Sequence, residues 1–212
     1  MPKPSSKLSA FRQRTQLVHA GRDPFEQHGF LNTPIYRGST VLFPTMDDLL
    51  HERARFTYGT KGTPTVASLE KAWSELSGAA GAVAVPSGLA AVSLALMSFV
   101  NSGDHLLVTD SAYRPTRVFC ERVLKRYGVE TTYFDPMIGA DIHGLLRSNT
   151  AAVLTEAPGS QSLEMQDIPA IAEVAHRHGA VVLMDNTWAT PLFFPPHEHG
   201  VDIAIEAGTK YL

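Results

Sequence analysis

The sequence predicts an α/β fold with a mainly parallel β-sheet that is covered by helices. Residues 180–184 and 201–205 are apolar, β-branched runs, and each run stops at a polar cluster that contains Asp185 or Lys210. Short apolar runs with such ends are typical of strands that are buried on both faces. Similar runs alternate with helical patterns from residue 65 onward, and this alternation favours parallel strands joined by helices.

The composition indicates one large domain with an appended arm. The 212 residues are 44% hydrophobic and 18% charged. A net charge of -3 and a pI near 6.3 give no general attraction for nucleic acid or an anionic membrane. The one cysteine, Cys120, excludes an internal disulfide framework and is interpreted as a small buried hydrophobe. No apolar run reaches membrane-spanning length, so the expected location is the cytoplasm; the basic residues 1–22 leave a transit peptide as an alternative.

Residues 1–64 are predicted to form an N-terminal arm and an irregular segment that lies at a contact between subunits. The polar residues 1–30 favour an extended arm with one short helix around residues 9–18. The dense proline and glycine of residues 31–64 predict irregular backbone with one short helix near residues 46–54. So long an irregular stretch is usually functional or interfacial.

Residues 65–212 predict the α/β domain. It is expected to be incomplete at its C-terminal end, because the chain stops just after Lys210, and we expect the chain to be the first part of a longer polypeptide. Gly78 and Gly179 each provide the left-handed residue that ends a helix. The predicted helices cover residues 65–77, 88–100, 115–127 and 167–178. The predicted strands cover residues 81–85, 106–109, 129–134, 151–155, 180–184 and 201–205.

Polar residues follow most of these strands, at the sheet edge where open α/β sheets bind ligands. They are Ser87 and Gly88, Thr109, Asp110 and Tyr113, residues 156–160, Asp185, Asn186 and Thr187, and Thr209 and Lys210. An acid and an amine that leave two buried strands match the needs of pyridoxal phosphate (PLP). A lysine holds its aldehyde as a Schiff base, and an aspartate keeps its ring nitrogen protonated. Taken alone, each residue is more often an ordinary strand end, turn former or helix cap.

The start of the helix at residue 88 predicts a phosphate cradle, because free backbone N–H groups and the helix dipole attract anions there. Ser87 is equally an ordinary N-cap. Tyr113 either stacks on a planar ring or packs over the end of the sheet. The dinucleotide, P-loop and serine-hydrolase glycine motifs are absent from the sequence. The histidine pairs at 176/178 and 197/199 are interpreted as solvated side chains, so no metal is expected.

Three motifs resemble the Cys/Met-metabolism family of PLP-dependent enzymes, of fold type I, over nearly the whole chain. They are Pro86-Ser87-Gly88-Leu89-Ala90-Ala91, Asp185-Asn186-Thr187-Trp188 and Thr209-Lys210-Tyr211-Leu212. The resemblance implies a large domain with a seven-stranded type of sheet, and a smaller C-terminal domain that is not in this chain. Gly159-Ser160 and Trp188 are most similar to the β-lyase branch, because γ-acting members typically have Thr-Asn and Phe there.

The resemblance also implies roles for individual residues. Lys210 would hold the cofactor and remove the substrate's Cα proton, and Asp185 would pair with the pyridine nitrogen. Tyr113 would stack on the ring, and either Lys210 or Tyr113 would assist the departing thiolate. Thr187 would lie against the other side of the ring.

The phosphate would be held by the N–H groups of Gly88 and Leu89, together with Ser87, and by the Thr209 hydroxyl. Tyr58 would reach the phosphate of a neighbouring subunit, within a homotetramer built from two active dimers. Members of the family usually have arginine two residues after this tyrosine, whereas this chain has Thr60, with Lys61 as a partial replacement. The arginine for the substrate's α-carboxylate is expected beyond residue 212.

The implied activity is β-elimination from an amino-acid thioether: cystathionine is cleaved to homocysteine, pyruvate and ammonia, as in methionine biosynthesis. One alternative is a γ-acting relative, namely a cystathionine γ-synthase, a γ-lyase or a sulfhydrylase, which would share the cofactor residues. A second alternative is a non-catalytic PLP-binding protein. A purely structural module explains the polar residues at one sheet edge least well.

Overall fold

The computed structural model describes residues 10–211. The chain forms two compact units, Met1–Ala84 and Val85–Leu212, which are described separately below. The domain division predicted after residue 64 stays a prediction.

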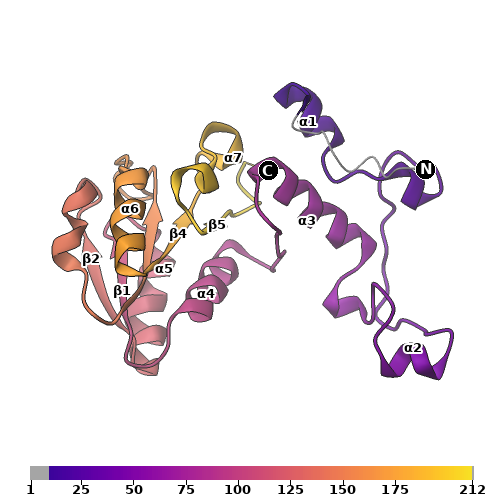
Figure 1. Cartoon of the computed structure of the whole chain (residues 1–212), viewed down its shortest axis with the longest axis horizontal. Coiled ribbons are helices and arrows are strands. Elements are labelled where there is room, and N and C mark those ends of the chain that lie inside the picture. Colours follow the sequence, from indigo (N-terminus) through magenta and orange to yellow (C-terminus); the bar gives the residue numbers. More distant parts are fainter. Residues whose placement is uncertain (1–9, 212) are drawn as a thin grey trace. The chain divides into compact units, whose positions relative to one another are not determined.

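The second unit is built around a five-stranded sheet whose neighbouring strands are all parallel, with the order β2-β1-β3-β4-β5 (Figure 1). The strands are β1 (His105–Thr109), β2 (Glu130–Phe134), β3 (Thr150–Glu156), β4 (Val181–Asp185) and β5 (Ile203–Ile205). The predicted α/β class and parallel sheet are therefore confirmed. Residues 10–211 form five strands of the seven-stranded type that the resemblance implies.

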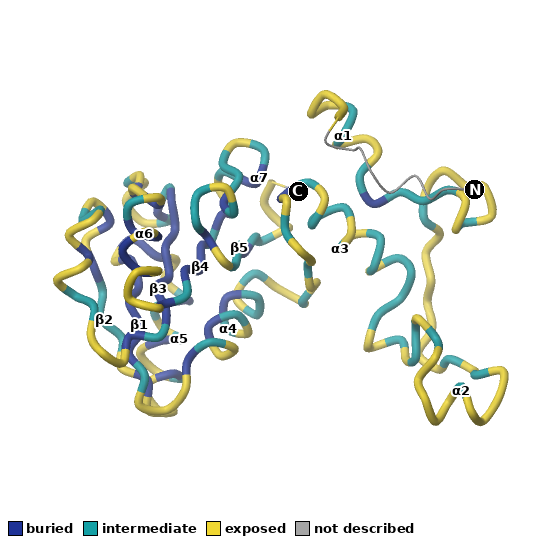
Figure 2. The backbone as a smooth tube through the Cα atoms, in the orientation of Figure 1, coloured by how far each residue is buried: buried dark blue, intermediate teal, exposed yellow. Residues whose placement is uncertain are grey.

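Alternating side chains of each strand pack on the two faces of this sheet. Leu107 and Val153 contribute to the core on the face covered by α6 (Ile168–His178). Leu154 and Leu183 belong to the core on the opposite face, which includes residues of α4 (Gly88–Phe99). Figure 2 shows that the central strands β1, β3 and β4 are mostly dark blue, which is the burial expected of a parallel sheet covered on both sides, whereas the edge strands β2 and β5 are mostly intermediate.

The helices of the second unit begin and end largely where the sequence predicts. Asp167 caps α6 through its carboxylate, and Gly179 ends it in a left-handed conformation. Helical backbone occupies the predicted residues 115–127, but the kind of helical turn changes along the segment. It consists of α5 (Arg114–Phe119), a π-helical turn η4 (Cys120–Leu124) and a 3₁₀ turn η5 (Lys125–Tyr127). The remaining elements, which were not predicted, are η6 (Gly139–Leu145), α7 (Thr190–Phe193) and η7 (Pro196–His199).

The strand predicted at residues 81–85 is wrong for this structure, which has irregular backbone there. Val83 is 78% exposed rather than buried. A strand requires a neighbour for its ladder of hydrogen bonds, and none of the five described strands pairs with this segment.

The first unit has short helices and much irregular backbone, as predicted. Its helices are α1 (Gln13–His19), η2 (Pro24–Gln27), α2 (Met46–Leu50), η3 (Gly59–Lys61) and α3 (Pro64–Ser77). Thr40 and Tyr58 form an isolated antiparallel bridge. A Cβ at Gly59 would lie 2.1 Å from the Gly38 carbonyl oxygen, so only glycine fits this close crossing. In the described part of the chain, no helix is long and apolar enough to cross a membrane.

We expect Leu96→Ala to lower the free energy of unfolding of the intact protein by about 2–5 kcal/mol, because it leaves a cavity in the core. The side chain of Leu96 is 0% exposed, whereas that of Leu94 on the same helix is 51% exposed. Leu94→Ala is the matched control and should cost less than about 1 kcal/mol. Urea unfolding measures both values, and equal losses in the two variants would contradict the packing described here.

Candidate active site

Two acidic residues end neighbouring strands at the carboxyl edge of the sheet. Glu156 ends β3 and Asp185 ends β4, and the two are partners in the parallel register. Side chains alternate along each strand, so Glu156 lies on the same face as Leu154, and Asp185 on the same face as Leu183. Both carboxylates therefore project on the α4 side of the sheet.

Asp185 is a half-buried residue whose carboxylate has no cationic partner. Its Oδ1 accepts a hydrogen bond of 3.1 Å from the backbone N–H of Thr187. Burial raises the pKa of the Asp185 carboxyl, and its hydrogen bonds with Thr187 oppose that rise. None of the ion pairs among residues 10–211 includes Asp185. This position would stabilise a positively charged ring nitrogen.

The segment that leads to Lys210 is held against the loop after β4. The Thr187 hydroxyl accepts a hydrogen bond of 2.8 Å from the backbone N–H of Ala207. The backbone N–H of Asn186 donates to the Ile205 carbonyl at 2.8 Å, and the Lys210 N–H donates to the Ala207 carbonyl at 3.0 Å. The acid of β4 and the lysine after β5 are thus carried by two connected loops.

The N-terminus of α4 packs against the same segment. Ser87 caps the helix, and its hydroxyl accepts a hydrogen bond of 3.1 Å from the Ala90 N–H. The first N–H groups of any helix have no partner within the helix, and here they belong to Gly88 and Leu89. A Cβ at Gly88 would lie 2.7 Å from the Ala207 Cβ, so glycine is what allows this helix end to approach. Donors for an anion therefore lie beside the lysine-bearing segment.

Glu156 connects two further loops at this edge. Its Oε2 accepts from the Tyr113 N–H at 2.8 Å, and its Oε1 accepts from the Ser160 N–H at 2.8 Å. The Ser160 hydroxyl donates to the same Oε1. Burial is the main cause that raises the pKa of Glu156 to about 7, and the neighbouring charge of Asp185 adds to the rise.

The aromatic residues of the site are only partly buried. Tyr113 precedes α5 and is 46% exposed, so its ring is available to a ligand. Trp188 and Tyr211 form a tilted pair with ring centroids 5.6 Å apart, which adds an apolar contact between the loops after β4 and β5. Tyr58 belongs to the first unit, where Lys61 is paired with Glu52 at 3.3 Å.

Most residues predicted for the site therefore lie in the second unit, and their contacts link several of them. Ala207 contacts both Gly88, at the start of α4 that Ser87 caps, and Thr187, which in turn binds Asp185. Glu156 binds the backbone of Tyr113 at the same edge of the sheet. Sequence reasoning assigned no role to Glu156, although an acid at the end of a buried strand beside Asp185 was a usable signal.

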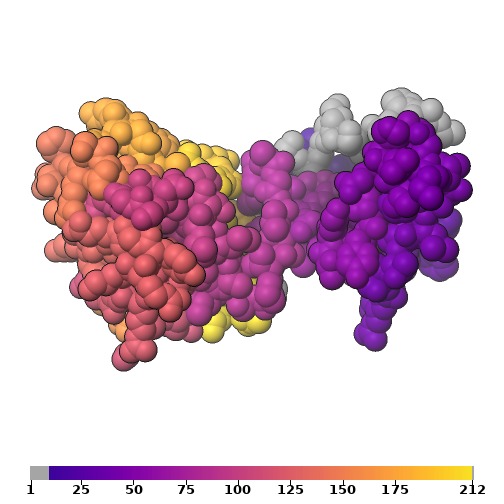
Figure 3. Space-filling model, turned by 90° about the horizontal axis from the view of Figure 1, so that it is seen from below, coloured from indigo at the N-terminus to yellow at the C-terminus, as the bar shows by residue number. Residues whose placement is uncertain are grey.

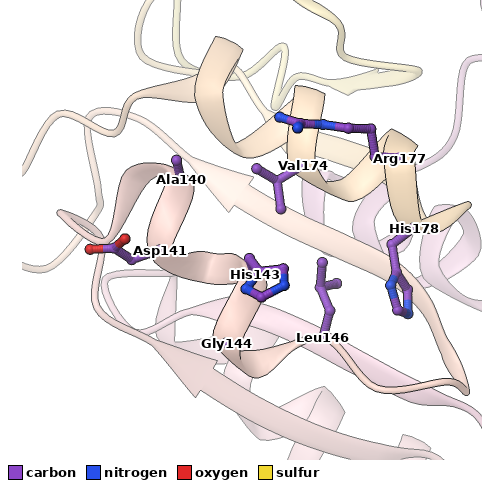
Figure 4. Close-up of a pocket in the computed structure, with 8 residues that line it drawn as sticks. All are labelled: Ala140, Asp141, His143, Gly144, Leu146, Val174, Arg177 and His178. Carbon is purple, nitrogen blue, oxygen red and sulfur yellow. The ribbon is translucent and has the colours of Figure 1, made fainter.

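Two cavities of the second unit lie at different ends of the sheet, and the smaller one borders the loops after β3 and β4. The larger, of about 650 Å³, lies between η6 and the end of α6, where Figure 4 shows Leu146, Val174, His143 and His178 lining it. The end of α6 leads into the start of β4, so this cavity is near the opposite edge of the sheet. A smaller apolar cavity of about 310 Å³ is lined by Met184, Trp188 and Phe194, among others. Within residues 10–211, no group of three His, Cys, Asp or Glu side chains could hold a metal ion.

Fold and site together define a PLP-type α/β protein, and comparison with known proteins identifies its family. Residues 14–212 match the family described as Cys/Met metabolism PLP-dependent enzyme. The chain is 59% identical over 197 residues to a putative cystathionine beta-lyase of Rhizobium johnstonii, covering 93% of this chain and 50% of that protein. It is 41% identical over 205 residues to cystathionine beta-lyase MetC of Escherichia coli, covering 93% and 52%.

Solved structures agree with this comparison. The metB structure from Corynebacterium glutamicum superposes with a TM-score of 0.91 at 29% identity, covering 97% of this chain and 53% of that one. A putative O-acetylhomoserine (thiol)-lyase of Campylobacter jejuni, whose structure contains a pyridoxyl-lysine phosphate, has a TM-score of 0.86 at 27% identity and covers 95% of this chain and 50% of that one. The chain belongs to the Cys/Met-metabolism family of PLP-dependent enzymes, and it spans about half the length of these relatives.

The residues present fit PLP as the cofactor. The half-buried Asp185 carboxylate without an ion-pair partner would hold the ring nitrogen. The N-terminus of α4 offers the N–H donors that a phosphate needs, and Lys210 provides an amine on the adjoining segment.

The raised pKa of Glu156 predicts how stability depends on pH in the cofactor-free protein. Its pKa is about 7 in the folded state and 4.5 for an ordinary glutamate, so between these pH values only the folded state keeps the proton. The free energy of unfolding should therefore fall as the pH rises through this window, by roughly 3 kcal/mol from this group. Glu156→Gln should abolish that share of the pH dependence, as measured by urea unfolding at both ends of the window.

Glu173→Gln is the control, because this exposed side chain of α6 loses the same charge without loss of a buried group. An identical pH dependence in wild type and Glu156→Gln would show that Glu156 titrates normally.

Proposed function

We propose that the protein containing this chain is a PLP-dependent carbon–sulfur β-lyase that cleaves cystathionine to homocysteine, pyruvate and ammonia. The observation that carries the cofactor chemistry is the half-buried Asp185 carboxylate, which has no cationic partner and lies beside the segment that bears Lys210. Support for cystathionine comes from relatives named cystathionine beta-lyase at 40–59% identity. The Gly159-Ser160 and Trp188 residues favour the same branch.

PLP, when bound, supplies an electron sink for the bond-breaking steps at the substrate's Cα. The Asp185 carboxylate keeps the ring nitrogen protonated, because its own burial makes a cationic partner favourable. Thr187 orients Asp185 through its backbone N–H and anchors Ala207 through its hydroxyl. This pair of contacts keeps the acid and the lysine-bearing segment in one arrangement.

Lys210 holds the cofactor through its amine and then acts as general base toward the Cα proton of the substrate. The backbone N–H groups of Gly88 and Leu89, with Ser87 and the Thr209 hydroxyl, hold the phosphate. Tyr113 stacks on the ring, and either Lys210 or Tyr113 assists the departing thiolate. Tyr58 reaches the phosphate of a neighbouring subunit.

A γ-acting enzyme is the second candidate function. It is favoured by similarity to proteins of that type, such as a cystathionine gamma-lyase of Bacillus subtilis at 33% identity over 201 residues. The cofactor residues would be the same, so the position at which the substrate is cleaved separates the two candidates. A non-catalytic PLP-binding protein would show neither cleavage.

We also propose a homotetramer in the cytoplasm. The first unit, the indigo and purple part of Figure 3, carries exposed apolar side chains that an assembly would bury. They include Phe25, Phe30, Ile35, Leu42 and Leu50. The buried free thiol of Cys120 suits a reducing compartment.

The function is tested by incubating the intact protein and PLP with cystathionine and identifying the keto acid. We expect pyruvate, whereas 2-oxobutyrate would move the function to the γ branch and neither product would leave the non-catalytic candidate. Lys210→Ala should abolish turnover because the general base is lost. Lys125→Ala, on the exposed surface, should stay within about twofold of wild type.

Asp185→Asn should lower kcat by about 100-fold or more, because the carboxylate charge is lost while the side-chain shape is kept. The cofactor-free variant should be at least as stable as wild type, since the burial of a charge is relieved. Asp167→Asn, which keeps a good N-cap on α6, is the matched control. Normal kcat in Asp185→Asn, measured with saturating PLP, would remove Asp185 from the mechanism.

A further inference from the structure

Glu156 is a buried acid whose two carboxylate oxygens contact different loops of the candidate site. The residue is 4% exposed. One oxygen accepts from the N–H of Tyr113 in the loop after β1, and the other from the N–H and hydroxyl of Ser160 in the loop after β3. We propose that Glu156 is the positioning residue that holds Tyr113 at the cofactor edge of the sheet.

The proposal deepens the proposed function, on which it rests, because Tyr113 is the ring assigned to stack on the cofactor. Tyr113 directly precedes α5, and its backbone N–H donates to the Glu156 carboxylate. The residue is about half exposed. A tether on the backbone therefore determines where the ring lies above the sheet.

The backbone around Glu156 is itself fixed, which makes the carboxylate a rigid tether. The Gln166 side-chain amide donates to the Glu156 carbonyl at 2.6 Å and to the Thr109 hydroxyl at 3.0 Å. These bonds connect the ends of β3 and β1. A Cβ at Gly159 would lie 2.4 Å from the Ser111 hydroxyl oxygen, so the two loops are in close contact.

A carboxylate suits this position because both of its oxygens accept hydrogen bonds. A glutamine has the same shape but only one accepting oxygen, and its NH₂ group would face one of the two N–H donors. Glu156→Gln is therefore expected to release one loop while the buried strands stay in place.

The first test is amide hydrogen exchange in the cofactor-free protein at a pH above the Glu156 pKa of about 7, where this side chain is a carboxylate. It does not depend on activity. In Glu156→Gln, the amides of Tyr113 or Ser160 should exchange at least about tenfold faster, which corresponds to loss of one charge-assisted hydrogen bond. The amide of Leu154, inside β3, should be unchanged. Ser160→Ala removes only the hydroxyl donor and should leave the Tyr113 amide protected, and Glu173→Gln should change neither.

The second test measures the cofactor in the loaded protein. Visible circular dichroism reports the asymmetric surroundings of the PLP ring, so it should change in Glu156→Gln while the PLP content stays near wild type. We expect kcat to fall by about tenfold with a smaller change in KM, because misplacement of a stacked ring affects the transition state more than binding.

The two proposals fail in different ways. Unchanged exchange at Tyr113 and Ser160, or faster exchange with an unchanged dichroism signal, would overturn the role of Glu156 even if pyruvate is formed. A wild-type protein that forms no pyruvate but shows the exchange and dichroism changes would overturn the β-lyase activity and keep the positioning role.

Discussion

Parallel pairing of the five strands is the constraint on which the candidate site depends. It brings the ends of β3, β4 and β5 to one edge, and the register then sets Glu156 beside Asp185 and Asp185 beside Ile205. Side chains alternate between the faces, so a slip of one residue in β4 would direct Asp185 toward α6. In the observed register Leu183 belongs to the core on the α4 face, and Val182 and Met184 belong to the core on the α6 face.

The burial of acidic side chains at this edge of the sheet lowers the stability of the cofactor-free fold and favours the binding of a cation. Two carboxylates share one face of the sheet, and desolvation raises the pKa of each of them. The cofactor-free fold therefore carries charges that it does not compensate, and a cationic ring nitrogen would relieve part of that cost. The hydrophobic clusters on both faces supply the stability that tolerates this arrangement. Binding and folding are coupled in such a site, because the ligand stabilises the state that holds it.

The sequence was sufficient to predict the parallel sheet and the polar residues at its edge, because buried strands and the polar residues that end them are local features of the sequence. It was insufficient at residues 81–85, where an apolar run lacks a described neighbour to pair with. The π-helical turn at Cys120–Leu124 was also not predicted, since a single π turn inside a helix is too short to set an apolar period of its own. The tie between Glu156 and Tyr113 joins residues 43 positions apart, and only the folded structure shows such a contact.

The close approach of Gly88 to Ala207 has a consequence for ligand choice. It brings the N–H donors of α4 close to the segment that bears Lys210. In PLP the phosphate arm and the aldehyde leave adjacent carbons of one ring, so a short spacing suits both groups at once.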